Sequence, residues 1–399
     1  MIFRDIFATL EEECTNSKIT ALNGARQVGK STALKYIYRK QKNANYISFD
    51  NASVKELFET NIDLFIEQYI LPYNMIFIDE FQYAKEGGKK LKYIHDLHSK
   101  KIFISGSSKP EIAIQSLQYL VGRVSLIEMY PLSFAEFVRF KSPQKAMLLD
   151  KPRSISDLTQ LRAEFTEYLM FGGYPDVVIE KNFEKKEKIL SDLVRVYLLK
   201  EIKDVLGYKN SDDFQKLLVI LASQNGCLGK ISSLSKHLQI SWDKLKEYLS
   251  VLTKTNIILA IKPFFTNKSK ELTKTAKYYF HDIGFINSLL NNFSTIEKRV
   301  DKGTLYETFI LHELQKKGYE PKFWNKQLSE VDFILEKNAN ICAIECKSIV
   351  SKVPKSLKIF LEEYLVLKSF IFTENFEEKK KEIQFTHYIN VSSLEFFQI

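Results

Sequence analysis

Three charged side chains near the carboxyl end of the chain are spaced for phosphodiester chemistry. Glu345 and Lys347 are two residues apart in an apolar run typical of a β-strand, so both should project from one face. Asp332 lies in the preceding run, and the polar turn at 337–340 predicts a hairpin that brings its carboxylate toward Glu345. Two carboxylates suit Mg²⁺, and the ammonium would stabilise developing negative charge. An ordinary solvated ion pair on a strand is the alternative interpretation.

This order of acid, hairpin and Glu-x-Lys resembles the PD-(D/E)xK phosphodiesterase superfamily. The resemblance implies a restriction-endonuclease-like α/β core of αβββαβ type, with a further metal-binding carboxylate on the preceding helix. Glu307 is the first choice for that carboxylate, and Glu313 is the second. A helix at 354–364 and strands at 369–373 and 386–391 would complete the core. Members of such families can retain the fold as a binding module, so binding without cleavage stays an alternative.

A glycine-rich segment near the amino end matches the pattern GxxxxGK[ST], and it lies between an apolar strand at 19–23 and a helical run. Its glycines would let backbone N–H groups approach phosphates, while Lys30 reaches the β and γ oxygens and the Ser31 hydroxyl binds Mg²⁺. The sequence therefore predicts an ATP site with Mg²⁺. The expected nucleotide-binding residues of this loop are Gly24, Ala25, Arg26, Gln27, Val28, Gly29, Lys30, Ser31 and Thr32.

Two acids, Asp79 and Glu80, end the next strongly apolar strand. We expect Asp79 to hold Mg²⁺ and Glu80 to orient the attacking water, because phosphoryl transfer depends on positioning and charge neutralisation. Ser107 and Ser108 end a further apolar strand and are candidate sensors of the γ-phosphate. Turn chemistry alone also accounts for serines at such a place.

Arg123 lies between a helical stretch and the apolar strand at 124–130, and its guanidinium could meet two phosphate oxygens at once. A surface arginine at the end of a helix is the alternative. The order of the glycine loop, the acid pair, the serines, Arg123 and the segment PLSFAEF resembles prokaryotic AAA-like ATPases with a C-terminal nuclease-like domain of uncertain function. The resemblance implies that Arg123 is an arginine finger, acting on a neighbouring subunit of a homo-oligomer. Ser133 and Glu136 form a capping box that predicts a helix start.

The region between these two ends predicts three helices within 214–254 and two strands within 257–281. That order suggests a winged helix, with Trp242 and the leucines of the third helix packed inward. Lysines outside this core could neutralise DNA phosphates, although such domains also serve as packing modules. The candidate DNA-binding residues are Lys244, Lys246, Lys268, Lys270 and Lys274.

Length and composition indicate a multidomain α/β protein, because 399 residues with 45% hydrophobic content exceed one core. The expected domains are a P-loop ATPase core with a parallel sheet of AAA/ASCE type at 1–130, a helical lid at 131–205, a winged helix at 206–290 and a nuclease-like domain at 291–399. The formal charge of +9 weakly favours nucleic-acid partners. We find no signal peptide and no apolar run that could span a bilayer, so a cytoplasmic location without a membrane partner is expected.

The leading hypothesis is therefore an ATPase that uses ATP and Mg²⁺, acts on DNA and carries a metal-dependent phosphodiesterase site with Glu345 and Lys347 as catalytic residues. The alternative is a nucleotide-dependent switch whose C-terminal domain binds DNA or another partner without cleavage. A transcriptional regulator that uses the winged helix is a third hypothesis.

Overall fold

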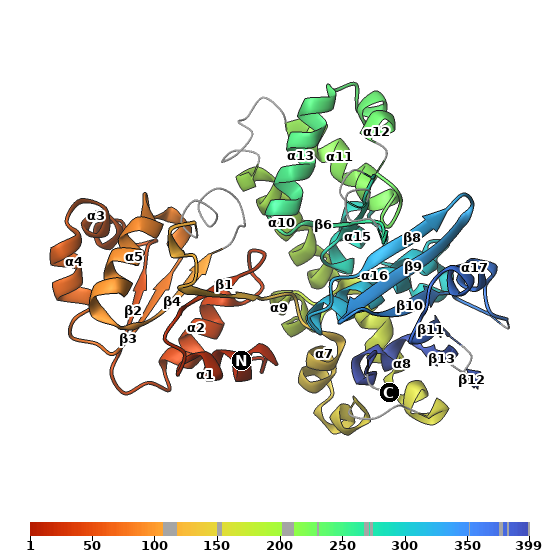
Figure 1. Ribbon diagram of the computed structural model, residues 1–399, viewed down its shortest axis with the longest axis horizontal. Coiled ribbons are helices and arrows are strands. Elements are labelled where there is room, and N and C mark those ends of the chain that lie inside the picture. Colours follow the sequence, from red (N-terminus) through yellow and green to blue (C-terminus); the bar gives the residue numbers. More distant parts are fainter. Residues whose placement is uncertain are drawn as a thin grey trace. The chain divides into compact units, whose positions relative to one another are not determined.

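The computed structural model (Figure 1) describes residues 1–106, 118–149, 154–201, 211–229, 231–266, 271, 274–350, 352–374, 378–380 and 383–397. The chain divides into two compact units, the first made of Met1–Tyr130 and Ser250–Ile257, the second of Pro131–Leu249 and Ile258–Ile399. Within the described part of the chain, no helix has the length and apolar character needed to cross a membrane.

The first unit contains a five-stranded sheet in which every pairing is parallel. The parallel α/β fold predicted for this region is thereby confirmed. Because the strands are parallel, their carboxyl ends meet at one edge, where the glycine loop and the acid pair emerge. The strand order is β2-β3-β4-β1-β5, and the strands are β1 (Ile19–Asn23), β2 (Ala44–Ser48), β3 (Met75–Asp79), β4 (Lys101–Gly106) and β5 (Val124–Glu128).

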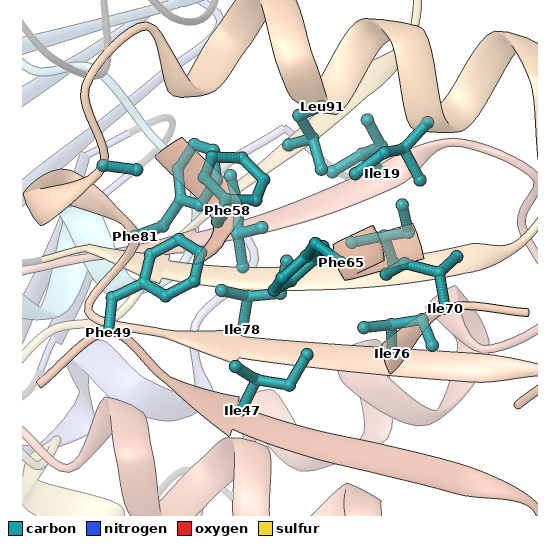
Figure 2. Close-up of a cluster of buried hydrophobic side chains, with 14 of the residues drawn as sticks. Ile19, Ile47, Phe49, Phe58, Phe65, Ile70, Ile76, Ile78, Phe81 and Leu91 are labelled. Atoms are coloured by element: carbon teal, nitrogen blue, oxygen red, sulfur yellow. The ribbon is translucent and has the colours of Figure 1, made fainter. Parts of the chain in front are cut away.

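Side chains alternate along the strands, so both faces of this sheet carry buried apolar residues. Figure 2 shows one face, where Ile76 and Ile78 of β3 pack with Phe58 and other buried side chains from the helices. Phe77 points to the opposite face and stacks on Phe103 at a centroid distance of 4.9 Å. The helices of this unit are α1 (Ile6–Glu13), α2 (Lys30–Tyr38), α3 (Ala52–Thr60), α4 (Ile62–Tyr69) and α5 (Gly87–His98).

A group of helices opens the second unit. The predicted capping box is present, since Ser133 accepts from the Glu136 backbone and the Glu136 carboxylate accepts from the Ser133 backbone. The rings of Phe134 and Phe165 pack edge-to-face against Phe309 of helix α16 (Lys302–Lys316), so these helices pack on the C-terminal region. A role as a lid over nucleotide stays a prediction. The helices are α7 (Phe134–Lys141), α8 (Ile155–Phe171), α9 (Pro175–Ile179) and α10 (Phe183–Glu201). Helix α15 (Ile283–Leu289) comes later in the chain and joins this group, because Asn287 donates to carbonyl oxygens of α8.

The predicted three helices and ribbon occur in the expected order. They are α11 (Ser211–Ser223), α12 (Ile231–Leu238), α13 (Trp242–Lys254), and the antiparallel strands β6 (Ile258–Ile261) and β7 (Lys277–Phe280). The expectation that Trp242 packs inward is wrong, because its side chain is 52% exposed. Trp242 is the first residue of α13, and the packed stripe begins one turn later at the buried Leu245.

The C-terminal region forms a six-stranded mixed sheet. Strands β9 and β10 join through Asn338 and Ala339, whose φ angles of 49° and 64° fit a two-residue hairpin turn. The strand predicted at 386–391 is wrong in its bounds, because β13 ends at His387 and the following apolar residues are buried in a 3-10 turn. The strand order is β12-β13-β11-β10-β9-β8, with β8 (Lys322–Lys326), β9 (Ser329–Lys337), β10 (Asn340–Cys346), β11 (Lys368–Thr373), β12 (Glu378–Lys380) and β13 (Ile383–His387), and α17 (Lys355–Glu363) lies between β10 and β11 in sequence.

Candidate functional site

The glycine-rich loop runs directly from the end of β1 into the first turn of α2. A Cβ atom on residue 24 would lie 2.1 Å from the Met129 carbonyl oxygen, so only glycine fits there. Gly29 has a φ of 101° and is the N-cap of α2, whose first residue is Lys30. The loop therefore ends at a helix N-terminus, where backbone N–H groups and the helix dipole favour a bound phosphate.

The ammonium of Lys30 is buried and directed at the loop itself. Its Nζ donates to the carbonyl oxygens of Gly24 at 2.9 Å and of Ala25 at 2.7 Å. Burial lowers the pKa of Lys30 to about 8, while the nearby carboxylate of Glu80 opposes that shift. A phosphate group would supply the negative charge that this buried ammonium lacks.

The carboxylates of Asp79, the last residue of β3, and of Glu80, which follows it, have different hydrogen-bond partners. The Asp79 carboxylate accepts hydrogen bonds from the Tyr46 hydroxyl at 2.6 Å and from the Ser105 hydroxyl. Glu80 adopts a left-handed conformation with a φ of 56°, and its carboxylate accepts from the Gln82 amide. Two hydroxyl groups thus hold the Asp79 carboxylate, as suits a metal-binding acid, while the Glu80 carboxylate is bound by Gln82 instead.

Arg4 supports the glycine loop, although the sequence analysis did not select it. Its guanidinium is 6% exposed and donates to the Val28 carbonyl at 3.0 Å and to the Tyr130 carbonyl at 2.7 Å. These bonds join the loop to the segment that follows β5. No local pattern marks such a residue, because it acts through backbone groups far from it in sequence.

The other residues predicted for this site are two serines and Arg123. Ser107 and Ser108 fall outside the described residues, and Ser105 is the serine that touches Asp79. The Arg123 carbonyl accepts from the backbone N–H of Ile19, the first residue of β1, so Arg123 lies at the sheet edge opposite the glycine loop. Its guanidinium pairs with Asp96 at 2.6 Å. Arg123 therefore cannot act on the loop of its own chain.

The C-terminal acidic site begins at the hairpin of β9 and β10. Ile344 pairs with Phe333, so the next residues, Glu345 and Asp332, come opposite each other. Lys347 Nζ lies 2.7 Å from the Glu345 carboxylate and 3.4 Å from that of Asp332. The predicted acid, acid and ammonium are thus brought together.

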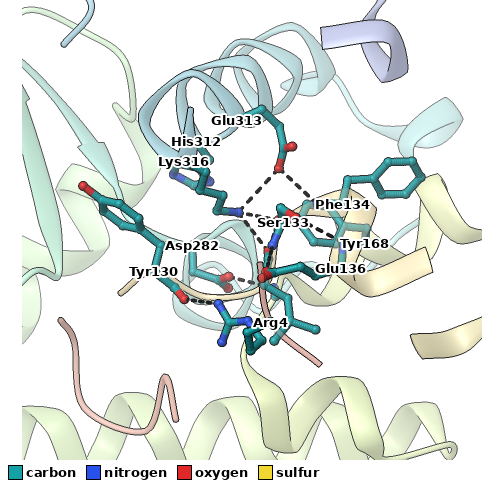
Figure 3. A network of polar contacts seen from close by, with 12 residues as sticks. Arg4, Tyr130, Ser133, Phe134, Glu136, Tyr168, Asp282, His312, Glu313 and Lys316 are labelled. Carbon is teal, nitrogen blue, oxygen red and sulfur yellow. Dashed lines mark hydrogen bonds and ion pairs between the residues drawn. The ribbon is translucent and has the colours of Figure 1, made fainter. Parts of the chain in front are cut away.

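Glu307 joins the C-terminal acidic site from helix α16. Its carboxylate accepts from the Tyr279 hydroxyl and lies 3.7 Å from Lys277 Nζ. Glu313, the second choice, is six residues further along the same helix and faces elsewhere. The Glu313 carboxylate accepts from the Phe134 backbone N–H at 3.0 Å. The Lys316 ammonium lies beside the same carboxylate (Figure 3). Glu313 is therefore excluded from the acidic site.

The two buried glutamates of the acidic site, Glu307 and Glu345, have raised pKa values. Burial, followed by the charge of Asp332, raises the pKa of Glu345 to about 8 and that of Glu307 to about 7. A bound cation would stabilise the ionised carboxylates and lower these pKa values, and the oxygen ligands suit a hard divalent ion. Yet, across the described ranges, no three His, Cys, Asp or Glu side chains are close enough to form a ready metal cluster. A metal ion would therefore require some of these side chains to move.

Of the predicted DNA-binding lysines, the structure describes Lys244, Lys246 and Lys274. Lys244 pairs with Asp213 at 2.9 Å, whereas the exposed Lys246 lies over the Trp242 ring at 3.9 Å. Lys274 is also exposed. The other two candidates, Lys268 and Lys270, lie outside the described residues.

Comparisons with known proteins agree with the first unit. Residues 16–138 match a family described as an AAA domain, whereas 162–295 and 302–394 match two domains of unknown function. Together with the parallel sheet and the loop geometry, the first match supports a P-loop ATPase. It does not extend to the acidic site, whose region is matched only by a family of unknown function.

Two of the similar proteins, both described as uncharacterized, match most of this chain. One from Methanocaldococcus jannaschii is 27% identical over 84% of this chain and 75% of its own length. Another from Haemophilus influenzae is 25% identical over 82% of each chain. A solved Walker-type ATPase of Pyrococcus abyssi is 16% identical, with a TM-score of 0.47 over 72% of this chain and 96% of its own.

Proposed function

We propose that this chain is a Mg²⁺-dependent ATPase that acts on DNA and carries a metal-dependent phosphodiesterase site in its C-terminal region. The observation that carries the proposal is the convergence of Glu307, Asp332, Glu345 and Lys347 from helix α16 and the hairpin that follows it, in a chain that also has a phosphate loop. These residue types are the ones that the resemblance to the PD-(D/E)xK phosphodiesterase superfamily implies.

In the ATPase part, Lys30 and the loop N–H groups would bind the phosphates. Ser31 and Asp79 would hold Mg²⁺, and Glu80 would orient the attacking water. Bound Mg²⁺ neutralises phosphate charge. The side chains fit these roles, since Asp79 is fixed by two hydroxyl groups and the Lys30 ammonium lies within electrostatic reach of both acids.

In the C-terminal part, Glu307, Asp332 and Glu345 would hold a divalent ion that supplies an activated water. Lys347 would stabilise negative charge on the phosphodiester, because its ammonium already lies between two of these carboxylates. The side chain of Lys347 is 39% exposed, so a substrate could reach it.

Cleavage of plasmid and single-stranded DNA, with Mg²⁺ or Mn²⁺, tests this part. We expect wild type to cleave and Lys347→Ala to lose cleavage while it keeps ATP hydrolysis. The control variant, Lys358→Ala, changes an exposed lysine on α17 and should cleave as wild type does. If purified wild type cuts neither substrate with either ion, the phosphodiesterase part of the proposal is wrong.

One observation favours the alternative, a nucleotide-dependent switch whose C-terminal region binds DNA or another partner. Each buried glutamate of the acidic site already has a lysine beside it, Lys347 at Glu345 and Lys277 at Glu307. If DNA raises the rate of ATP hydrolysis without being cut, the result would support a switch whose C-terminal region binds DNA. An unchanged rate would point to a protein partner.

A homo-oligomer with Arg123 reaching a neighbouring subunit belongs to the same proposal. Arg123 is 36% exposed and pairs with Asp96, so it would have to exchange that carboxylate for phosphate oxygens. We expect the ATPase rate per chain to rise with protein concentration in wild type and to stay flat in Arg123→Ala. Equal concentration dependence in both proteins would remove Arg123 from the site.

A further inference from the structure

Lys277 is a buried lysine of strand β7 that contacts the acidic site from outside the C-terminal sheet. Its Nζ lies 3.7 Å from the Glu307 carboxylate and also pairs with Glu330. The side chain is only 3% exposed. A buried ammonium is costly unless carboxylates compensate its charge, so Lys277 and these two glutamates form one electrostatic group.

The backbone fixes the position of this ammonium. Lys277 pairs with Ile261 of β6 on one side and bridges to Leu228 on the other. Tyr279 is two residues further along the same strand and shares its face, and its hydroxyl donates to Glu307. The ribbon therefore presents both an ammonium and a hydroxyl to a single carboxylate.

The charges of the acidic site are distributed between two lysines. Lys347 lies beside Glu345 and Asp332, while Lys277 lies beside Glu307 and Glu330. A divalent ion needs carboxylate oxygens as ligands, and the Glu307 oxygen nearest the ribbon already faces an ammonium and a hydroxyl. A metal ion and Lys277 would thus compete for the same carboxylate.

We propose that Lys277 is the resident cation at Glu307 and competes with a divalent metal ion for that carboxylate. The inference rests on the metal site in the proposed function. Lys277 is a positioning residue in this scheme, because it acts on a metal-binding carboxylate. Since it belongs to the ribbon of β6 and β7, a displacement of β7 would release Glu307 for the metal.

Mn²⁺ binding to the full chain, measured by calorimetry without nucleotide, tests the competition. We expect Lys277→Gln to bind one Mn²⁺ at least about tenfold more tightly than wild type, because a competing positive charge is gone. Lys277→Arg, which keeps the charge, and Lys262→Gln, which changes an exposed lysine directly after β6, should behave as wild type. Adding Glu307→Gln to Lys277→Gln should abolish the gain.

The loss of Lys277 leaves two carboxylates without their shared cation, so the variant could unfold. In that case millimolar Mn²⁺ should restore its circular dichroism spectrum and raise its Tm, and it should do so only while Glu307 is present. Failure of Mn²⁺ to restore an unfolded Lys277→Gln would overturn the inference, as would unchanged affinity in a folded one.

The same titration separates this inference from the proposed function. Tight Mn²⁺ binding by wild type, with Lys277→Gln no tighter, would refute the competition and leave the metal site standing. If neither protein binds Mn²⁺ at this site, both the competition and the metal site fail.

Discussion

The two candidate sites differ in how the chain builds them. At the candidate ATP site, one continuous segment of nine residues, Gly24 to Thr32, would supply the phosphate-binding groups, and strand β3, which β4 separates from β1, would add the two acids. At the acidic site, the charged groups come from a helix, a hairpin and the ribbon strand β7. The first site depends mainly on local backbone geometry, whereas the second depends on tertiary packing.

A tyrosine supports a carboxylate in both places, from a strand that does not carry the acid. Tyr46 of β2 donates to Asp79, and Tyr279 of β7 donates to Glu307. Burial, together with the nearby carboxylate, raises the pKa of both phenols, so each stays a donor at neutral pH. The sites differ in their cations, because Lys30 bonds to backbone carbonyls while Lys277 and Lys347 pair with acids. The ammonium of Lys30 is therefore available to an anion such as phosphate, whereas the lysines of the acidic site are already balanced by carboxylates.

The largest expected effect is at the candidate ATP site. Lys30→Ala should lower ATP turnover by about 1000-fold, because one buried ammonium is the main positive charge of the phosphate loop. Arg39→Ala, at the exposed end of the same helix, is the matched control and should keep wild-type activity. Turnover is measured as phosphate release with Mg²⁺. Turnover by Lys30→Ala at the wild-type rate would show that the loop is not the ATP site.

A somewhat smaller effect is expected at Glu80. Glu80→Gln should slow hydrolysis by about 100-fold while nucleotide affinity stays the same, because the amide cannot take a proton from the attacking water. Single-turnover hydrolysis and binding of a fluorescent ATP analogue measure the two quantities. Glu67→Gln, on the exposed side of α4, should change neither. Weakened binding in Glu80→Gln would instead give this acid a role in holding the nucleotide.

These differences also explain what could be predicted from the sequence. The parallel fold of the first unit follows from apolar strands and a contiguous glycine pattern, which are both local features. The hairpin that brings Asp332 to Glu345 is local as well, since two turn residues set its register. Ser105, Tyr46 and Lys277 act through contacts made only after distant strands pair, so no spacing in the sequence marks them.

Two errors have the same physical origin. Helical spacing identified a stripe on α13 but not where along the helix packing starts, so exposed Trp242 was placed in the core. The apolar residues after His387 are buried, as expected, but in a 3-10 turn and not in a strand. Apolar character predicts burial more directly than it predicts backbone conformation.

At the acidic site, the free energy of unfolding should depend on pH. Because the pKa values of Glu345 and Glu307 are raised to about 8 and about 7, the folded chain binds more protons than the unfolded chain between about pH 4.5 and 8. Stability should therefore fall as the pH rises through that window. In chelator-containing buffer, Glu345→Gln should reduce the fall by roughly 4 kcal/mol, since one titrating group is gone.

Urea unfolding at pH 5 and pH 9 measures this difference. Glu362→Gln, on an exposed position of α17, is the control and should follow wild type at both pH values. If Glu345→Gln loses as much stability between the two pH values as wild type, Glu345 is not held protonated by its surroundings.

The smallest expected effect tests whether the candidate ATP site also depends on side chains from distant strands. Tyr46→Phe removes only the hydroxyl that donates to Asp79 at 2.6 Å. One such bond to a charged group contributes on the order of 1 kcal/mol, so kcat/KM for ATP should fall about fivefold. The Mg²⁺ concentration needed for half-maximal activity should rise, because Asp79 is less firmly placed. Tyr93→Phe, an exposed tyrosine of α5, should change neither quantity. An unchanged Mg²⁺ requirement in Tyr46→Phe would mean that Ser105 alone holds Asp79, and that the ATP site depends even less on distant strands than its hydrogen bonds indicate.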